Sequence, residues 1–401
     1  MPDLNRRNFL IAGGAIGALS ALVGVAPLPV GASGGSTAIG SQACADPEWE
    51  WDQDADPIAA AIVDRGDTAA VNAALHSWTT NGQVLPAGLP GYVRDFIENA
   101  RQLPQWADPA LLHAVTDFTK RRGTYLGVLY GFGSGLMSTT IPRESRAVYY
   151  SKGGAAMKDR IAKTSKLGYD IGALDAYQPH GSMIVTAVKT RLVHAAVRHL
   201  LPQSPAWSKV TNEKVPISQA DLLVTWNSLA TFSMQKMTDW NIHIPAGDAD
   251  AFLHLWQVSA HMLGIRDDYI PATWDAANTQ YAHLLEPVLG PTPEGIALCK
   301  ELLAIVAQAD GGASRPLLCA FIRYTCGDQI ADWLQLPRYP GWERTVRVYW
   351  PQFVAAKEGF NHIPLTPNLS WTFDELLRRA VLFFLNEGKP IYITIPDMNR
   401  P

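Results

Sequence analysis

The segment KTRLVHAAVRH at residues 189–199 decides how the chain is interpreted, and it lies in a longer helical pattern from Gly181 to Leu201. Arg191, His194 and Arg198 follow the i, i+3, i+7 spacing, so they share one face of that helix. Positively charged Arg neighbours disfavour protonated His, so we expect His194 to be neutral and free to coordinate a metal. The arginines would then neutralise nearby carboxylates. The same spacing also describes a partly exposed basic helix face.

The rest of the chain also favours an all-α fold with a large interior. Helical patterns with Asp, Ser or Pro at their starts recur along most of the sequence. The segment Pro390–Ile395 alone alternates like a strand, and Gly131–Pro142 is rich in Gly, Ser and Thr and is typical of a loop. We expect one helical domain from residue 45 to residue 401. The predicted helices are 56–64, 67–77, 90–102, 110–129, 154–165, 181–201, 218–235, 248–263, 293–309, 316–334 and 373–385.

Composition excludes several classes of protein. The 401 residues hold 33 Lys and Arg against 37 Asp and Glu, a net charge of −4, which argues against a nucleic-acid binder. Only 17% of residues are charged while 47% are apolar, which favours a large buried core with an apolar cavity. The sequence contains no H-E-x-x-H, C-x-x-C, C-x-x-C-H or G-x-G-x-x-G motif, so zinc hydrolases, covalent haem attachment and dinucleotide binding are not indicated.

The N-terminus is typical of an export signal. Arg6 and Arg7 precede a weakly apolar, Gly- and Ala-rich run to Val25, and small-residue cleavage sites follow. We therefore expect residues 1–32 to be a twin-arginine signal and the protein to be secreted. A membrane anchor is the alternative, although the Gly-rich run is poorly suited to it.

A second polar cluster precedes the Arg–His helix. Arg160, Lys163 and Thr164 lie at i, i+3 and i+4 on a mostly apolar helix, so they share a face. Glu144 follows the Gly-rich segment and suits a general base, or it is a surface residue paired with Arg143 or Arg146.

The remaining histidines and cysteines are ambiguous in sequence. His254 and His261 lie seven residues apart and form a metal site or two core histidines with ordinary partners. Cys319 and Cys326 are too far apart on one helix for a mutual disulfide. The sequence leaves two alternatives open: a disulfide between Cys299 and one of these two cysteines, or free thiols throughout.

Together these motifs resemble the latex clearing proteins. The resemblance rests on Glu144, the R-I-A-K-T run at 160–164, the R-L-V-H-A-A-V-R run at 191–198 and the segment His261–Thr273. The Lys-Thr pair after Arg160 is its most specific mark. The latex clearing proteins are secreted rubber oxygenases within a wider family of helical haem proteins that have a globin-like core.

The resemblance implies a b-type haem and O₂ as co-substrate. His194 is similar to the proximal iron ligand of that family, and Arg191 and Arg198 match its arginines beside that histidine. Lys163 resembles the lysine that occupies the sixth iron position in a closed state.

The resemblance also implies a catalytic set and a substrate. Glu144 resembles the catalytic base of the family, and Arg160 and Thr164 resemble its supporting polar residues. The implied reaction is oxidative cleavage of cis-1,4-polyisoprene to oligomers with aldehyde and ketone ends, by a monomer without stable membrane insertion. Two alternatives remain at this stage: an oxygenase or peroxidase acting on another lipid or isoprenoid, and an exported binder of apolar ligands without haem.

Overall fold

The computed structural model describes residues 39–151, 156–213, 215–361 and 366–400. The expected export signal at residues 1–32 lies outside these ranges. Residues Ala38–Pro401 form one compact unit.

The described residues are helical and contain no strand, so the all-α prediction is confirmed. The helices are α2 (Ala55–Asp64), α3 (Thr68–His76), α4 (Gly91–Ala100), α5 (Pro109–Val128), α6 (Gly135–Met137), α7 (Pro142–Tyr150), α9 (Met157–Ile171), α10 (Met183–Leu200), α11 (Trp207–Val210), α12 (Gln219–Asp239), α13 (Ala246–Met262), α14 (Trp274–Gln280), α15 (Pro293–Ala307), α16 (Arg315–Cys326), α17 (Asp328–Trp333), α18 (Pro340–Phe360) and α19 (Thr366–Leu385).

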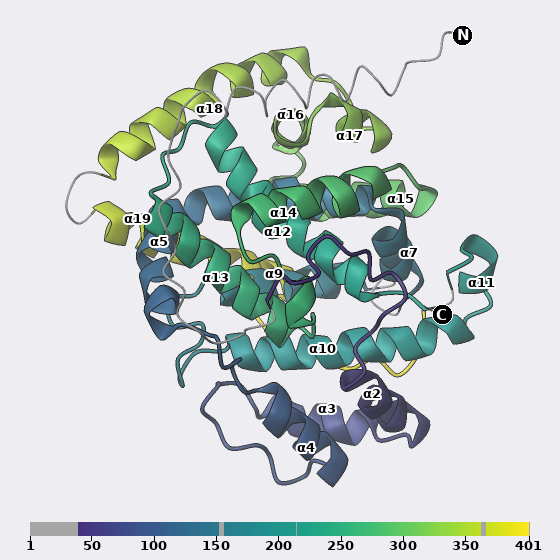
Figure 1. Cartoon of the computed structure of the whole chain (residues 1–401). Helices are drawn as coiled ribbons and strands as arrows, with labels where there is room; N and C mark the ends of the chain where they lie inside the picture. Colours follow the sequence, from purple (N-terminus) through teal and green to yellow (C-terminus); the bar gives the residue numbers. More distant parts are fainter. Residues whose placement is uncertain (1–38, 152–155, 214, 362–365, 401) are drawn as a thin grey trace. The chain divides into compact units, whose positions relative to one another are not determined.

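The central helix is α10, which carries the Arg–His segment. It crosses the molecule with α2, α3 and α4 on one side and α12 and α13 on the other (Figure 1). It packs against α2, α9 and α13 and is buried along most of its length. Local sequence signals start the neighbouring helices: the Asp108 side chain accepts a hydrogen bond from the Ala110 amide at the start of α5, and Ser218 and Asp221 form a capping box on α12.

The prediction of a loop at Gly131–Pro142 is wrong. The chain continues from α5 as a π-helix (Leu129–Ser134), α6 and a 3-10 helix (Ser138–Thr140). The hydroxyls of Thr139 and Thr140 bond back to carbonyl oxygens three residues earlier, at 2.6 and 2.7 Å. Gly133 is required for close packing, because an added Cβ would lie 2.7 Å from the ring of Phe232.

Two other predicted elements are wrong, and one long helix was not predicted. Pro390–Ile395 is extended but has no partner strand; the Asn72 side chain on α3 bonds both the amide and the carbonyl of Ile395, at 2.8 and 2.9 Å. The helix predicted over 316–334 is divided at Gly327, whose φ of 92° no ordinary side chain favours. Helix α18 was not predicted, because Pro351 lies inside it and several of its apolar residues face outward.

Candidate active site

His194 lies in the middle of α10, in the interior but still partly accessible, and its lowered pKa keeps the imidazole neutral. Its Nδ1 atom is buried, and the ring makes no hydrogen bond to any described residue. Burial, followed by the positive charges of Arg198 and Arg160, lowers the pKa of the imidazole to about 3. A neutral histidine without partners is free to bind a metal. His199 faces away, as expected, and lies 2.8 Å from Asp64.

The two arginines on the His194 face are ion-paired within the chain. The Arg191 Nη2 atom donates to Asp52 Oδ1 at 2.7 Å and to Asp54 Oδ2 at 3.2 Å. The Arg198 Nε atom donates to Asp56 Oδ1 at 2.7 Å. The carboxylates that these arginines neutralise here therefore belong to α2 and the residues before it. A cofactor that contacted Arg191 or Arg198 would have to share the guanidinium group with these aspartates.

His254 and His261 have ordinary hydrogen-bonding partners, which supports their interpretation as core histidines and not as a metal site. The His254 Nε2 atom accepts a hydrogen bond from the Asp108 amide at 2.8 Å. The His261 Nδ1 atom lies 2.6 Å from Asp267 Oδ1. No cluster of three or more His, Cys, Asp or Glu residues suited to a metal ion occurs in the part of the chain that the structure describes.

All four cysteines are free thiols, with Cys299 and Cys319 buried in the core. The possible disulfide between Cys299 and a neighbour is absent from this structure.

Glu144 is held inside the molecule in the first turn of α7. Ile141 is extended because it precedes Pro142, and Pro142 starts the helix, which turns Glu144 inward. Burial raises the pKa of this carboxyl to about 8, although a short hydrogen bond from Thr225 Oγ1 on α12 opposes the shift. Thr225 Oγ1 also lies 3.1 Å from the Asp221 carbonyl oxygen, so protonated Glu144 can donate to Thr225 while Thr225 donates onward.

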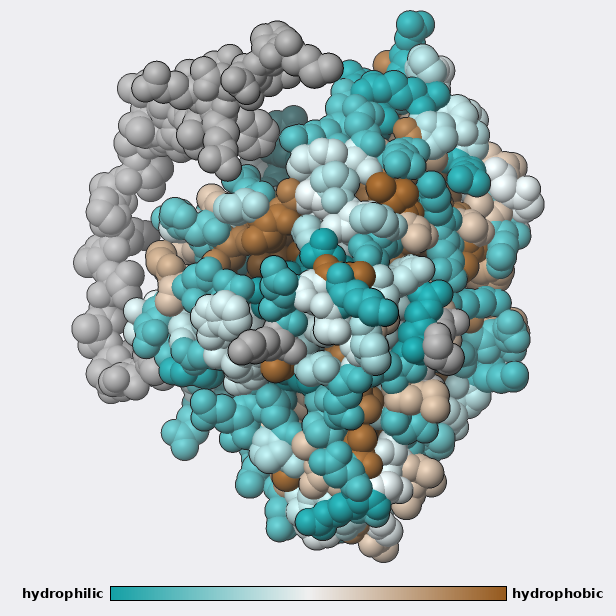
Figure 2. Space-filling model, turned by 90° about the vertical axis from the view of Figure 1, so that its right-hand side faces the viewer, coloured by the Kyte–Doolittle hydropathy of each residue, from teal (hydrophilic) through white to brown (hydrophobic). Residues whose placement is uncertain are grey.

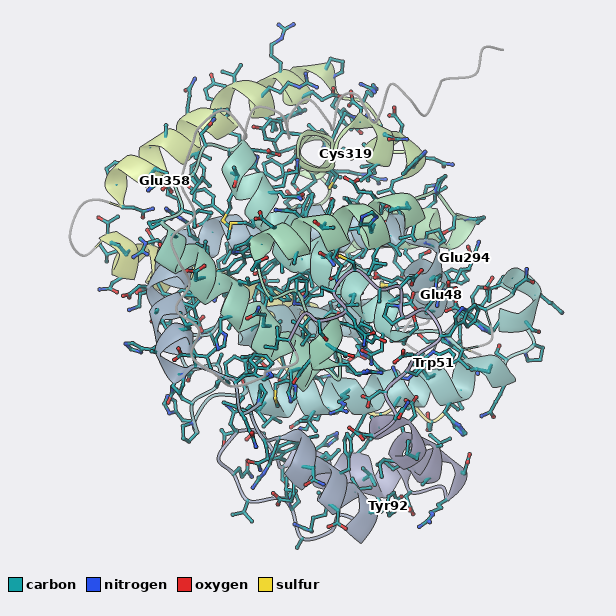
Figure 3. The ribbon with its side chains drawn as sticks, viewed as in Figure 1. Glu48, Trp51, Tyr92, Glu294, Cys319 and Glu358 are labelled. Carbon is teal, nitrogen blue, oxygen red and sulfur yellow. The ribbon has the colours of Figure 1, made fainter. Side chains whose placement is uncertain are left out.

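The salt-bridge interpretation of Glu144 is wrong. Arg143 forms an ion pair with Glu48, and Arg146 lies 3.9 Å from Glu294. Both partner carboxylates lie near α7 (Figure 3). Glu144 is thus left out of the charge network formed by its two arginine neighbours.

Arg160 on α9 completes a group of three residues with Glu144 and His194. Its guanidinium makes no hydrogen bond or ion pair with any described residue, and burial lowers the pKa of the group to about 10 while Glu144 opposes that shift. Its charge acts on both Glu144 and His194, so the three side chains are close together. All three keep partial accessibility although burial perturbs their pKa values strongly. Glu144, Arg160 and His194 therefore form one partly accessible group in the interior, contributed by α7, α9 and α10.

Lys163 and Thr164 lie outside this group in the structure. The Lys163 Nζ atom is 2.7 Å from Asp159 Oδ2 and 3.0 Å from Thr394 Oγ1, and Thr164 is exposed. Arg160, Lys163 and Thr164 therefore do not point together toward Glu144 and His194. Coordination of a metal by Lys163 requires the contacts with Asp159 and Thr394 to break.

Sequence reasoning missed Thr225 and Asp52. Thr225 lies 81 positions after Glu144 and belongs to no motif, so nothing in the sequence connects the two. Asp52, Asp54 and Asp56 are a sequence signal for basic partners, but such a run alone does not select Arg191 and Arg198.

A separate set of apolar residues lines a pocket of about 320 Å³. It lies between the start of α5, the segment after α9, and α13, and its lining includes Leu103, Leu112, Leu174, Tyr177 and Leu255. None of the predicted site residues lines it.

A histidine with a lowered pKa, a carboxyl group with a raised pKa and an arginine without an ion-pair partner among the described residues come together from α10, α7 and α9. The sequence that contains them matches an oxygenase family. The catalytic-domain model of that family, described as ER-bound oxygenase mpaB/B'/Rubber oxygenase, matches residues 120–356. The chain belongs to this family and is an enzyme.

Two relatives are more specific. The chain is 58% identical over 407 aligned positions, covering all of both proteins, to the rubber oxygenase of Streptomyces sp. strain K30. It is also similar to a solved structure of latex clearing protein in the closed state, with 61% identity and a TM-score of 0.80 over 88% of this chain and 95% of that one. No helix of the described residues is long and apolar enough to cross a membrane.

Proposed function

We propose that the chain is a haem-dependent dioxygenase that cleaves the double bonds of cis-1,4-polyisoprene with O₂, giving oligomers with aldehyde and ketone ends. One observation carries the proposal: His194, which is kept neutral by its lowered pKa and has no hydrogen-bonding partner among the described residues, lies in one group with Arg160 and Glu144, an acid whose pKa is about 8. The identity to a rubber oxygenase over the whole chain supports the choice of substrate.

The residues present fit a b-type haem. His194 supplies the iron ligand, because its ring is neutral and has no competing hydrogen bond to a described residue. Arg160 is an unpaired buried cation and suits a carboxylate of the cofactor, and Arg191 and Arg198 add positive charge that is shared with their aspartates. When bound, the haem iron supplies the position at which O₂ is activated.

Binding of the polymer rests on apolar area alone. Polyisoprene offers no charge and no hydrogen-bonding group, so an isoprene unit is held at about 25 cal/mol for each Å² of apolar surface removed from water. The low dielectric environment that raises the pKa of Glu144 is the same apolar environment that such a substrate needs.

Glu144 then acts on the allylic carbon next to the double bond. In its ionised form the carboxylate accepts a proton from that carbon, and Arg160 limits the cost of the negative charge. The proton returns to the substrate before the products leave, because one alkene and one O₂ give one aldehyde and one ketone without a net proton change. Thr225 holds the Glu144 carboxyl in both protonation states.

Lys163 gates the site. Its Nζ atom would coordinate the haem iron once the contacts with Asp159 and Thr394 break, and those contacts hold it in its present position. Exchange between the two positions opens and closes access for O₂.

We further propose that the protein is secreted by the twin-arginine route and acts as a monomer. The Arg6-Arg7 pair and the weakly apolar run that follows it support export, and the polymer substrate lies outside the cell.

Product analysis tests the activity. The purified protein is incubated with synthetic cis-1,4-polyisoprene under ¹⁸O₂, and the products are reduced at once and analysed by mass spectrometry. We expect oligomers that carry one labelled oxygen at each end, and Glu144→Gln is expected to form them about 10²–10⁴-fold more slowly. Unlabelled products, or no cleavage of polyisoprene alongside turnover of another isoprenoid, would contradict the proposal.

A further inference from the structure

Helix α19 has its apolar residues on the outside. Asp374, Arg378 and Leu385 are its buried residues. Four large apolar side chains spaced along the opposite face are exposed: Leu369 by 69%, Phe373 by 65%, Leu376 by 67% and Phe383 by 68%. These four residues form what we call the α19 stripe. A surface helix of a water-soluble protein normally has the reverse arrangement.

Specific polar contacts fix this orientation. Thr124 Oγ1 on α5 donates to the Asp374 carboxylate at 2.8 Å, and the Arg378 guanidinium lies 5.7 Å from the centre of the Tyr169 ring on α9. Gly123 allows the close approach, because an added Cβ would lie 2.7 Å from Asp374 Oδ2. Turning α19 over to bury its apolar residues would break these contacts. The exposed stripe is thus part of the folded structure.

Helix α18 repeats the pattern. Tyr349, Phe353 and Phe360 are exposed by 63%, 43% and 58%, at spacings that keep them on one helix face. Its inner side is held by Glu358, which pairs with Arg122 of α5 at 2.7 Å (Figure 3). Two successive helices are therefore anchored to α5 by polar groups and present apolar groups to the outside.

The face of the molecule turned away from α18 and α19 looks different. Seen from the right-hand side of Figure 1, it is mainly hydrophilic, with hydrophobic residues confined to separate patches (Figure 2). Other large exposed apolar side chains, such as Trp49 and Val84, lie singly in the sequence. The concentration on α18 and α19 marks an interaction surface.

We propose that the α19 stripe is the surface by which the enzyme adsorbs to the hydrocarbon surface of its solid polymer substrate. This inference rests on the proposed function, since it takes polyisoprene as the substrate. The centre of the stripe carries no charge, which matches a partner that has neither charges nor hydrogen-bonding groups. The stripe also lies only one helix away from the site, because the opposite face of α19 packs on α9, the helix that carries Arg160 and Lys163.

Adsorption solves a physical problem of this reaction. The polymer does not dissolve, so an enzyme with an internal site must hold itself at the particle while a chain segment enters. In the free protein the stripe exposes apolar area to water, and adsorption to the particle removes that area from water, which is favourable.

The test compares two matched double variants. Phe373→Gln with Leu376→Gln alters the stripe, and Trp49→Gln with Val84→Gln alters apolar residues of similar exposure elsewhere. Glutamine keeps the net charge and suits a helix. Binding to emulsified synthetic cis-1,4-polyisoprene is measured without O₂, by flotation of the particles and assay of the protein left in solution. Rates with O₂ are measured on the particles and on a short, dispersed oligo-isoprenoid.

The stripe variant is expected to bind particles about tenfold more weakly and to lose rate on them, while keeping its rate on the short substrate. The control variant should match the wild type in all three measurements. Equal adsorption by the stripe variant and the wild type would overturn the proposal, and so would equal losses in both variants.

Three further results would also overturn it by identifying another occupant. A dimer that the stripe substitutions dissociate, with adsorption unchanged, identifies a second copy. Preference for lipid vesicles over polyisoprene identifies a membrane. A melting temperature lowered by the substitutions identifies a segment of this chain packed over the stripe. If only the proposed function is wrong, the wild type adsorbs but cleaves neither substrate.

Discussion

Replacing Thr225 by Val is expected to shift the pH dependence of the reaction to more alkaline values. The hydroxyl of Thr225 favours the ionised form of Glu144, and its loss leaves the charge of Arg160 alone to oppose the effect of burial. A hydrogen bond to a charged group contributes about 1.5–3 kcal/mol and one to a neutral group about 0.5–1.5 kcal/mol, a difference of about 1.4 kcal/mol. That difference corresponds to one pH unit. The midpoint of the rise in rate with pH should therefore move from about 8 to about 9.

The assay is the initial rate of carbonyl formation from a short oligo-isoprenoid between pH 6 and pH 10.5. At pH 7 the variant should be about tenfold slower than the wild type, and near pH 10 the two rates should converge, because both carboxyls are then ionised. Thr225→Ser keeps the hydroxyl and should keep the wild-type profile. Thr231→Val removes another buried hydroxyl of α12, which bonds Asn227 instead, and should leave the midpoint in place. A Thr225→Val variant slowed by the same factor at every pH would refute the reasoning, because the hydroxyl would then serve folding or positioning alone.

Two further predictions concern Lys163 and Glu144. Asp159→Asn weakens a helical i, i+4 ion pair with Lys163 that is worth about 0.3–0.5 kcal/mol. The low-spin fraction of the absorption spectrum, in which Lys163 binds iron, should therefore rise about twofold, and Lys163→Ala should abolish it. Identical spectra in all three proteins would exclude Lys163 as the ligand. The raised pKa of Glu144 means that the folded protein binds this proton more tightly than the unfolded chain, so stability falls as pH rises from about 4.5 to about 8, by at most about 5 kcal/mol. Glu144→Gln removes this dependence and should unfold at a higher urea concentration than the wild type at pH 9 but not at pH 5; equal midpoints at pH 9 would show that the carboxyl ionises without cost.

The sequence was sufficient for the local features of the site. The i, i+3, i+7 pattern placed His194 on one helix face with two arginines, and the lowered pKa of the imidazole agrees with the neutral ring expected there. The start of α5 at Asp108 followed from capping chemistry, which depends only on adjacent residues.

Features that depend on long-range packing were not predicted. The pairing of Arg191 with Asp52 joins positions 139 residues apart, and Thr225 reaches Glu144 from another helix. A helical pattern gives the face on which a side chain lies but not the element that covers that face. The outward stripe of α19 was missed for a related reason, since apolar periodicity does not show whether the apolar face points into the core.

The measurement that tests the central claim most directly is the absorption spectrum of the purified protein and of its His194→Ala variant. The wild type should show a strong Soret band, and the variant should lose most of it, because no other described histidine combines a neutral ring, burial and the absence of a hydrogen-bonding partner. His199→Ala, one turn along the same helix, serves as the control and should keep the band, since His199 pairs with Asp64 instead. Full haem content in the His194→Ala variant, or no Soret band in the wild type, would contradict the account.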